Sequence, residues 1–132
     1  MKNIKALVYK ALAEKLGEDH VTDSYPQNWA NLPAVQYTEE ENKVSERTDE
    51  GETKSYVRYR VDIWDSKTTS PSAGLVDEAL GVPIDRIKDG TAFGLSRTAC
   101  ADTPDPSGLK HKVMRYEGII DMENEDYIYW ND

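Results

Sequence analysis

The residues best suited to chemistry or binding lie on one stretch, Ser55–Asp65, with the sequence S-Y-V-R-Y-R-V-D-I-W-D. Apolar side chains alternate here with polar and aromatic ones, and successive side chains of a β-strand point to opposite faces of a sheet. The pattern therefore predicts a half-buried strand. The core face would carry Val57, Tyr59, Val61 and Ile63. The other face would carry Tyr56, Arg58, Arg60, Asp62 and Trp64.

Two interpretations of the arginines on this strand stay open. In the first, Arg58 and Arg60 form an intersubunit surface, where their guanidinium groups meet carboxylates of a neighbouring copy, either Glu39–Glu41 or the C-terminal tail. In the second, the strand face is solvated, and the arginines pair within the chain with Glu117 or Asp62.

Catalytic and metal chemistry find little support in the remaining residues. His20 and His111 are far apart, no nucleophile-elbow or phosphate-loop motif is present, and one cysteine with two histidines cannot complete a structural zinc site. Asp102 and Asp105 lie in a Pro-Gly turn, and Glu39–Glu41 is expected to be a solvated loop. We therefore expect no enzyme activity, no cofactor and no metal.

Length and charge restrict the class of protein further. The 132 residues fit a single domain, and a net charge of −9 makes sequence-specific nucleic-acid binding unlikely because phosphate backbones would be repelled. Cys100 is the one cysteine, so no disulfide can form within the chain. No apolar run is long enough to span a membrane. Charged residues interrupt the N-terminal segment, which predicts a helix and not a signal peptide.

Two helices are predicted. Apolar residues at helical spacing indicate an amphipathic helix over Asn3–Leu16, with Gly17 just beyond its end. The second helix would begin at Ser70-Pro71, with serine as N-cap and proline at the first position, and end at Gly81. A further helical turn is expected around Ile84 and Ile87.

Several shorter segments read as strands. We expect a short strand over Ala34–Thr38, and a segment Lys43–Thr48 that pairs with Ser55–Trp64 across the connection Asp49–Lys54. Further strands are predicted at Phe93–Ala101 and Lys110–Met122, on either side of a turn at Asp102–Gly108. Alternation along Lys110–Met122 would place one set of side chains on one face and His111, a strand residue near this turn, on the other face. The first set is Met114, Tyr116, Gly118, Ile120 and Met122, and the second is His111, Val113, Arg115, Glu117 and Ile119. The acidic tail Glu123–Asp132 carries the aromatic residues Tyr127, Tyr129 and Trp130, and is either a docking arm or a last edge strand.

This order of elements predicts an α+β fold, an antiparallel sheet packed on one face by two helices within a single domain of residues 1–132. The other sheet face would be left for a neighbour. Tyrosine and tryptophan supply most of the aromatic content, and both are enriched at interfaces.

The chain resembles the small tail-completion proteins of tailed bacteriophages and related prophage-derived particles, also called tail terminators or head–tail joining proteins. The resemblance covers the chain up to Asp121 and rests on the order of its segments. Those segments are the N-terminal helix, L-P-A-V-Q-Y, S-Y-V-R-Y-R-V-D-I-W-D, the helix at S-P-S-A, and D-T-P-D-P-S-G-L-K-H-K-V-M-R-Y-E-G-I-I-D.

The resemblance implies a structural virion protein that forms a ring, typically a hexamer, at the head-proximal end of the tail tube. Its partners would be other copies, the tail-tube protein, the head connector or neck protein, and the sheath in contractile systems, with DNA passing through the lumen unbound. The protein would be assembled in the host cytoplasm and located in the virion tail or neck. The family has no catalytic residues to transfer.

The candidate interface consists of the outward strand residues, the glutamates and the aromatic tail. These residues are Tyr56, Arg58, Arg60, Trp64, Glu39, Glu40, Glu41, Tyr127, Tyr129 and Trp130. Two alternatives to a tail terminator remain, a head-completion or neck protein and a small cytosolic ligand-binding or enzymatic α+β domain.

Overall fold

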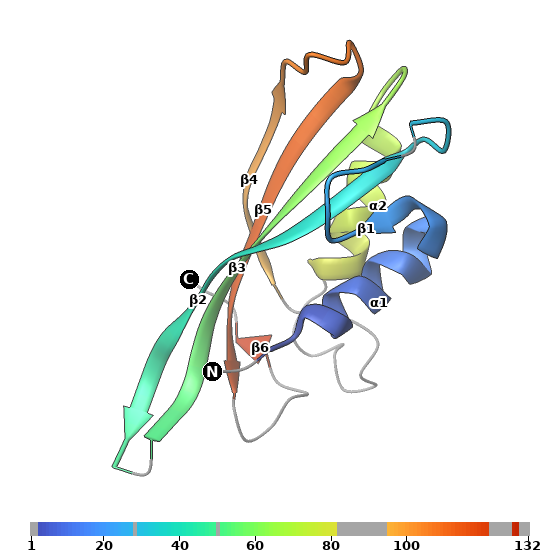
Figure 1. The fold of residues 1–132 in the computed structure, drawn as a ribbon. Coiled ribbons are helices and arrows are strands. Elements are labelled where there is room, and N and C mark those ends of the chain that lie inside the picture. The colour runs from blue at the N-terminus through green and yellow to red at the C-terminus, as the bar shows by residue number, and fades with distance from the viewer. Residues whose placement is uncertain (1–2, 28, 50, 82–94, 122–127, 130–132) are drawn as a thin grey trace.

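The computed structural model describes residues 3–27, 29–49, 51–81, 95–121 and 128–129. Its elements, shown in Figure 1, are α1 (Lys5–Leu16), the 3₁₀-helix η1 (Glu18–His20), β1 (Val21–Thr22), β2 (Ala34–Thr48), β3 (Gly51–Asp65), α2 (Ser70–Leu80), β4 (Ser96–Thr103), β5 (Lys110–Asp121) and β6 (Ile128–Tyr129). The strands form one sheet in the order β1-β2-β3-β5-β4, with β6 paired to β5. All pairings are antiparallel except that of β1 with β2.

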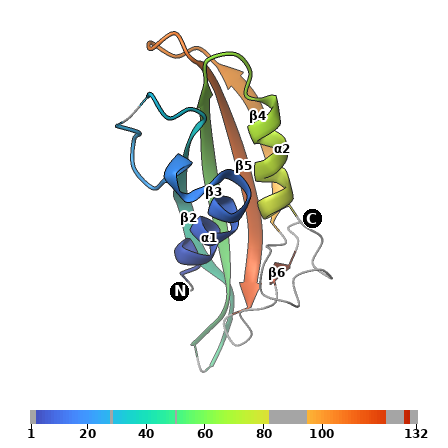
Figure 2. The same cartoon turned by 90° about the vertical axis from the view of Figure 1, so that its right-hand side faces the viewer.

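Both helices lie on the same face of the sheet (Figure 2), which confirms the predicted α+β arrangement. The strand face beneath them is apolar. Val57, Tyr59, Val61 and Ile63 of β3 are fully buried, as are Met114, Tyr116 and Ile120 of β5. The predicted alternation of these two strands is therefore confirmed, because a one-residue slip would have exposed the whole apolar set.

Helix α1 begins two residues later than expected and ends as predicted. The side-chain oxygen of Asn3 accepts a hydrogen bond from the Lys5 amide at 3.0 Å. Gly17 has a φ of 95°, a conformation that side chains disfavour, and its amide donates to the Ala13 carbonyl at 2.8 Å. Val8 and Leu12, one helical turn apart, are fully buried against the sheet.

Helix α2 matches its predicted span, but its cap lies one residue earlier than predicted. Thr69 is the N-cap residue, because its carbonyl accepts the first helical hydrogen bond, from the Ala73 amide at 2.9 Å. Ser70 is therefore the first helical residue and Pro71 the second, a position that also requires no proline N–H.

Strand β2 is longer than the predicted strand at Ala34–Thr38. It continues through Glu39–Glu41 to Thr48 and pairs with β3 along its length, so the expected solvated loop at the glutamates is wrong. The predicted pairing of Lys43–Thr48 with β3 is confirmed, and the connection is shorter than Asp49–Lys54 because β3 already begins at Gly51. Pairing with β3 provides hydrogen-bond partners for the backbone N–H and C=O groups of this polar segment. The composition of the segment does not reveal this pairing.

The second half of the sheet follows the predicted pattern with shifted bounds. β4 begins at Ser96 instead of Phe93 and continues to Thr103, and β5 ends at Asp121. The predicted helical turn at Ile84 and Ile87 lies outside the described residues, as do Tyr127 and Trp130. Tyr129 belongs to β6, where it pairs with Ile119, so this part of the tail is an edge strand.

Candidate interaction surface

The sheet face opposite the helices collects charged and aromatic side chains from β2, β3 and β5. We call it the open face and define it by Glu40, Glu41, Lys43, Tyr56, Arg58, Arg60, Asp62, Trp64, His111, Arg115 and Glu117. In the part of the chain that the structure describes, both helices lie on the other side of the sheet (Figure 2).

Opposite charges alternate across the centre of the open face. Arg58 lies 3.3 Å from Glu40 and 3.1 Å from Glu41. Arg115 donates to both carboxylate oxygens of Glu40, at 3.0 and 3.4 Å. Glu40 thus bridges two guanidinium groups from different strands, and this is the arrangement that planar donors favour.

A β-bulge in β2 brings the two glutamates to the same face. The register with β3 shifts between Glu39, which is opposite Tyr59, and Glu41, which is opposite Arg58. The extra residue, Glu40, therefore breaks the alternation, and Glu40 and Glu41 both reach the arginines.

Glu39 contacts the opposite side of the sheet. It accepts a hydrogen bond from the Tyr59 hydroxyl at 2.8 Å, on the side of the core. Burial, together with this carboxylate, raises the pKa of Tyr59. The three glutamates therefore do not form one interface cluster, because the strand distributes them between two faces.

Tyr56 joins the open face through both its hydroxyl and its ring. The hydroxyl donates to the Glu117 carboxylate, and the Lys43 ammonium lies 4.9 Å from the ring centroid. Desolvation first, and then the hydrogen bond to Glu117, raise the pKa of Tyr56 to about 12. Glu117, predicted as a partner of the arginines, pairs with the neighbouring tyrosine.

Arg60 and Asp62 form a tight pair on the same strand. Arg60 donates to both Asp62 oxygens, at 2.7 and 2.9 Å, and this hydrogen bonding raises the pKa of Arg60. Arg60 also lies directly opposite Arg115 in the register. Like charges at such positions repel, so Asp62 and Glu40 compensate for the two cations.

His111 links Asp62 to the turn after β4. Its Nε2 lies 2.8 Å from Asp62 Oδ2, and its Nδ1 lies 3.5 Å from Asp105 Oδ1. The ring stacks on Trp64 with centroids 4.6 Å apart. His111 is therefore a strand histidine near a turn, as predicted.

Among the predicted interface residues whose side chains the structure describes, Trp64 is the most buried, with 2% of its surface exposed. Its indole N–H donates to Asp105 at 3.1 Å, and its ring meets Tyr25 and Trp29 edge to face at 5.6 and 5.5 Å. Trp29 therefore packs on this end of the sheet. Within one copy, this end of the open face is covered by the chain's own loop.

The carboxylates that contact Arg58 and Arg60 all belong to the same chain. Of the predicted in-chain partners, Asp62 is confirmed for Arg60. Arg115, which was not predicted as a partner of Glu40, lies 3.0 Å from it. The alternation of Lys110–Met122 predicts that Arg115 and Glu117 share one face. It does not predict which residue of β2 lies near Arg115, because β3 separates β2 from β5.

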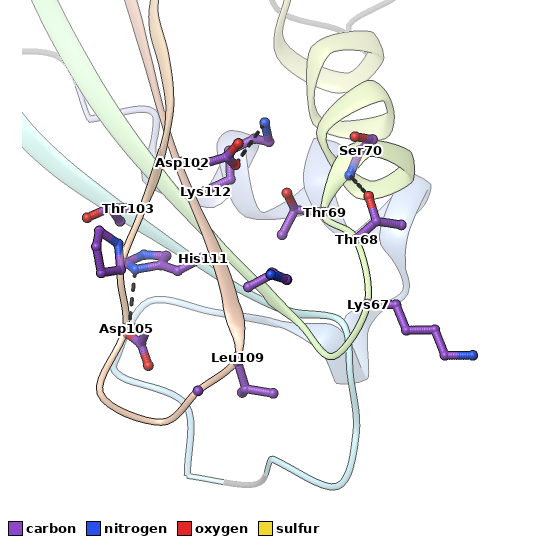
Figure 3. A pocket seen from close by; sticks show the side chains of 13 residues that line it. Lys67, Thr68, Thr69, Ser70, Asp102, Thr103, Asp105, Leu109, His111 and Lys112 are labelled. Carbon is purple, nitrogen blue, oxygen red and sulfur yellow. Dashed lines mark hydrogen bonds and ion pairs between the residues drawn. The ribbon is translucent and has the colours of Figure 1, made fainter.

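A shallow cavity of about 670 Å³ lies beside this end of the sheet, between the start of α2 and the turn joining β4 to β5. Figure 3 shows Lys112 and Asp102 side by side on neighbouring strands of its wall, where they form an ion pair of 3.2 Å. Thr69, Ser70 and Asp105 also line the cavity, and Lys67 extends away from the other labelled side chains. Hydroxyls and charges of both signs could hold a small polar molecule.

The described residues contain no group of three or more His, Cys, Asp or Glu side chains that could hold a metal ion. No helix among them is long and apolar enough to cross a bilayer. No protein-family model matches this chain, and no curated protein matches its sequence.

Proposed function

We propose that this protein is a structural subunit of a phage or phage-derived particle, a ring-forming tail terminator that caps the tail tube and joins it to the head connector. The observation that carries the proposal is the one-sided sheet. The helices cover one face, while the open face keeps a network of charged and aromatic side chains about one-third exposed at Arg58, Arg60 and Arg115.

A one-sided sheet supplies the two different surfaces that a ring requires. Subunits in a closed ring meet head to tail, so each copy contributes two distinct patches. The charges of the open face are already paired within the chain, which lowers the cost of bringing them against another protein surface. A net charge of −9 also suits a ring through which DNA passes without being held.

The partners proposed on this basis are other copies of the chain, the tail-tube protein and the connector or neck protein, with a sheath protein in a contractile tail. The protein would be assembled in the bacterial cytoplasm and located in the virion. Among the candidate interface residues, Arg58, Glu40 and Glu41 are the best placed on the open face, whereas Trp64 supports the fold beneath it.

A second candidate, a small ligand-binding domain, is favoured by the cavity beside α2. Its volume of about 670 Å³ suits a small molecule, and its lining offers both hydroxyls and charges. An enzyme or ligand-binding domain would keep one small oligomeric state with or without tail tubes.

The experiment that separates the two candidates is mass photometry and negative-stain imaging of the purified protein, alone and with tail-tube protein. Rings, or caps on tube ends, are expected. A monomer at every concentration that ignores tubes would overturn the terminator proposal and direct attention to the cavity.

A further inference from the structure

Strand β4 leaves one edge of the sheet open. None of its eight residues is buried, and within the described residues its only strand partner is β5. Its central residues, T-A-C-A, are small, and β4 contains no lysine or proline. Lysine and proline are two of the features that protect edge strands. β4 instead carries Arg97 and Asp102 near its ends and a β-bulge between Arg97 and Ala99, so its unprotected part is the short stretch Ala99–Ala101.

The opposite edge of the sheet is also open over most of its length. β1 pairs only with Val35 and Gln36 of β2, and beyond them β3 is the one strand that pairs with β2 in the described part of the chain. The carboxylates of Glu39–Glu41 turn toward Tyr59, Arg58 and Arg115, away from this free edge. They therefore leave the backbone of β2 accessible.

The strands at the two edges of the sheet run in opposite directions, which allows them to pair antiparallel between copies. The path β2-β3-β5-β4 consists of antiparallel steps, so β4 runs opposite to β2. A copy related by rotation about a ring axis would bring its β2 antiparallel to β4 of the preceding copy without being inverted. Such a contact joins two different edges and is therefore heterologous, as ring closure requires.

Val44 is an exposed apolar residue on the free part of β2. Through Ser55 it is level with Ile120 of β5, whereas Cys100 is level with Met114, so a contact between Val44 and Cys100 of the next copy requires the two edges to be staggered by six residues. Val44 on β2 is 40% exposed, and it lies opposite Ser55, on the helix-side face of the sheet. Cys100 is the exposed residue on the same face of β4, because it lies opposite the buried Met114. Bringing Val44 against the small side chains around Cys100 would cover apolar surface on both copies.

We infer that copies of this chain join through their sheet edges, with β4 of one copy pairing antiparallel with β2 of the next and Cys100 facing Val44. This inference rests on the proposed ring and names the surface that builds it. The open face and the helix layer would then remain available for the tube and the connector.

Disulfide trapping in the full-length chain tests the contact directly. Val44→Cys places a second thiol that can pair with Cys100 of a neighbouring copy. Lys43→Cys is the matched control, because Lys43 lies opposite Tyr56 on the other face and points away from Cys100. After mild oxidation, Val44→Cys should give a ladder of cross-linked multimers on a non-reducing gel, and Lys43→Cys should give at least tenfold less. Adding Cys100→Ser to Val44→Cys should abolish the ladder.

The other outcomes are also decisive. Rings that cap tubes but give no Val44→Cys ladder would overturn the edge contact and leave the proposed function intact. A ladder without tube capping would support the edge contact and overturn the terminator role. A cross-linked dimer of the unaltered chain would indicate pairing of β4 with itself, which contradicts the inference, and a persistent monomer would overturn both proposals.

Discussion

The two faces of the sheet use the same chemical pair in different surroundings. On the helix side, Tyr59 donates to Glu39 and Tyr116 donates to Asp77, both at 2.8 Å, and both rings are fully buried. On the open face, Tyr56 donates to Glu117 from a half-buried position. The comparison teaches that access to water determines how much each hydrogen bond contributes to the free energy of unfolding. A buried acceptor that loses its donor cannot replace the lost hydrogen bond with one from water.

The largest effect is expected at Trp64, where the open face behaves like a core. Trp64→Ala should reduce the free energy of unfolding by about 3–5 kcal/mol, because the fully packed indole leaves a cavity under Tyr25 and Trp29. Urea denaturation monitored by circular dichroism measures the loss. An unchanged denaturation midpoint would show that the indole contributes little to the packing of this end.

The next largest loss of stability is expected at Arg60, and it should exceed the loss at Arg58 on the same face. Arg60→Glu should cost about 1–3 kcal/mol, because it removes one of the two partners of Asp62, whose side chain is 6% exposed, and adds a second carboxylate beside it. Arg58→Glu is the control and should lower the free energy of unfolding by less than Arg60→Glu does, since its partners Glu40 and Glu41 are more exposed than Asp62. Chemical denaturation of both variants tests the ranking, and equal losses would contradict it.

Charge reversal also tests the role of the open face in assembly. If this face meets a partner in the ring or on the tube, Arg58→Glu should weaken assembly while the monomer stays folded. Light scattering and mass photometry would detect the change. Unaltered rings and unaltered tube capping would remove Arg58 from the interface.

A smaller effect compares the two tyrosine–glutamate pairs directly. Tyr59→Phe should cost about 1–2 kcal/mol, because Glu39 loses its donor on the core side, whereas Tyr56→Phe should cost about 0.5 kcal/mol or less because water can replace the hydroxyl. Paired denaturation curves measure the difference. Equal costs would indicate that Tyr56 and Glu117 are screened from water in the free protein.

The smallest effect is a pH dependence at Tyr56. Its pKa rises from 10.0 to about 12 on folding, so the folded state favours the neutral phenol. The associated stability is present below about pH 10 and is lost as the pH rises through about 12. Phenolate absorbance should show a late step that Tyr56→Phe reduces, with later steps remaining from Tyr59 and Tyr116, whose pKa values are raised by burial. A Tyr56→Phe titration identical to that of the unaltered protein would contradict the assignment.

Much of the fold could be predicted from the sequence because its signals are local. The apolar spacing of Val8 and Leu12 requires a helix with one buried side, and Gly17 provides the φ of 95° that ends it. The alternation of Ser55–Asp65 determines which side chains of β3 enter the core. The segment Glu39–Glu41 was misjudged because its strand conformation depends on pairing with β3 and not on its own preferences.

The sequence by itself determined the α+β layout and the alternation of β3 and β5, because these depend on neighbours along one or two strands. It left the partner of Arg60 open, and the structure shows that this partner is Asp62. Only the tertiary structure decided that a bulge turns Glu40 toward Arg58 and Arg115, that Glu39 faces the core, and that Trp64 is enclosed by a distant loop. These contacts depend on the register between strands far apart in the chain, and hydrophobic periodicity specifies the face of a strand without specifying its partner residues.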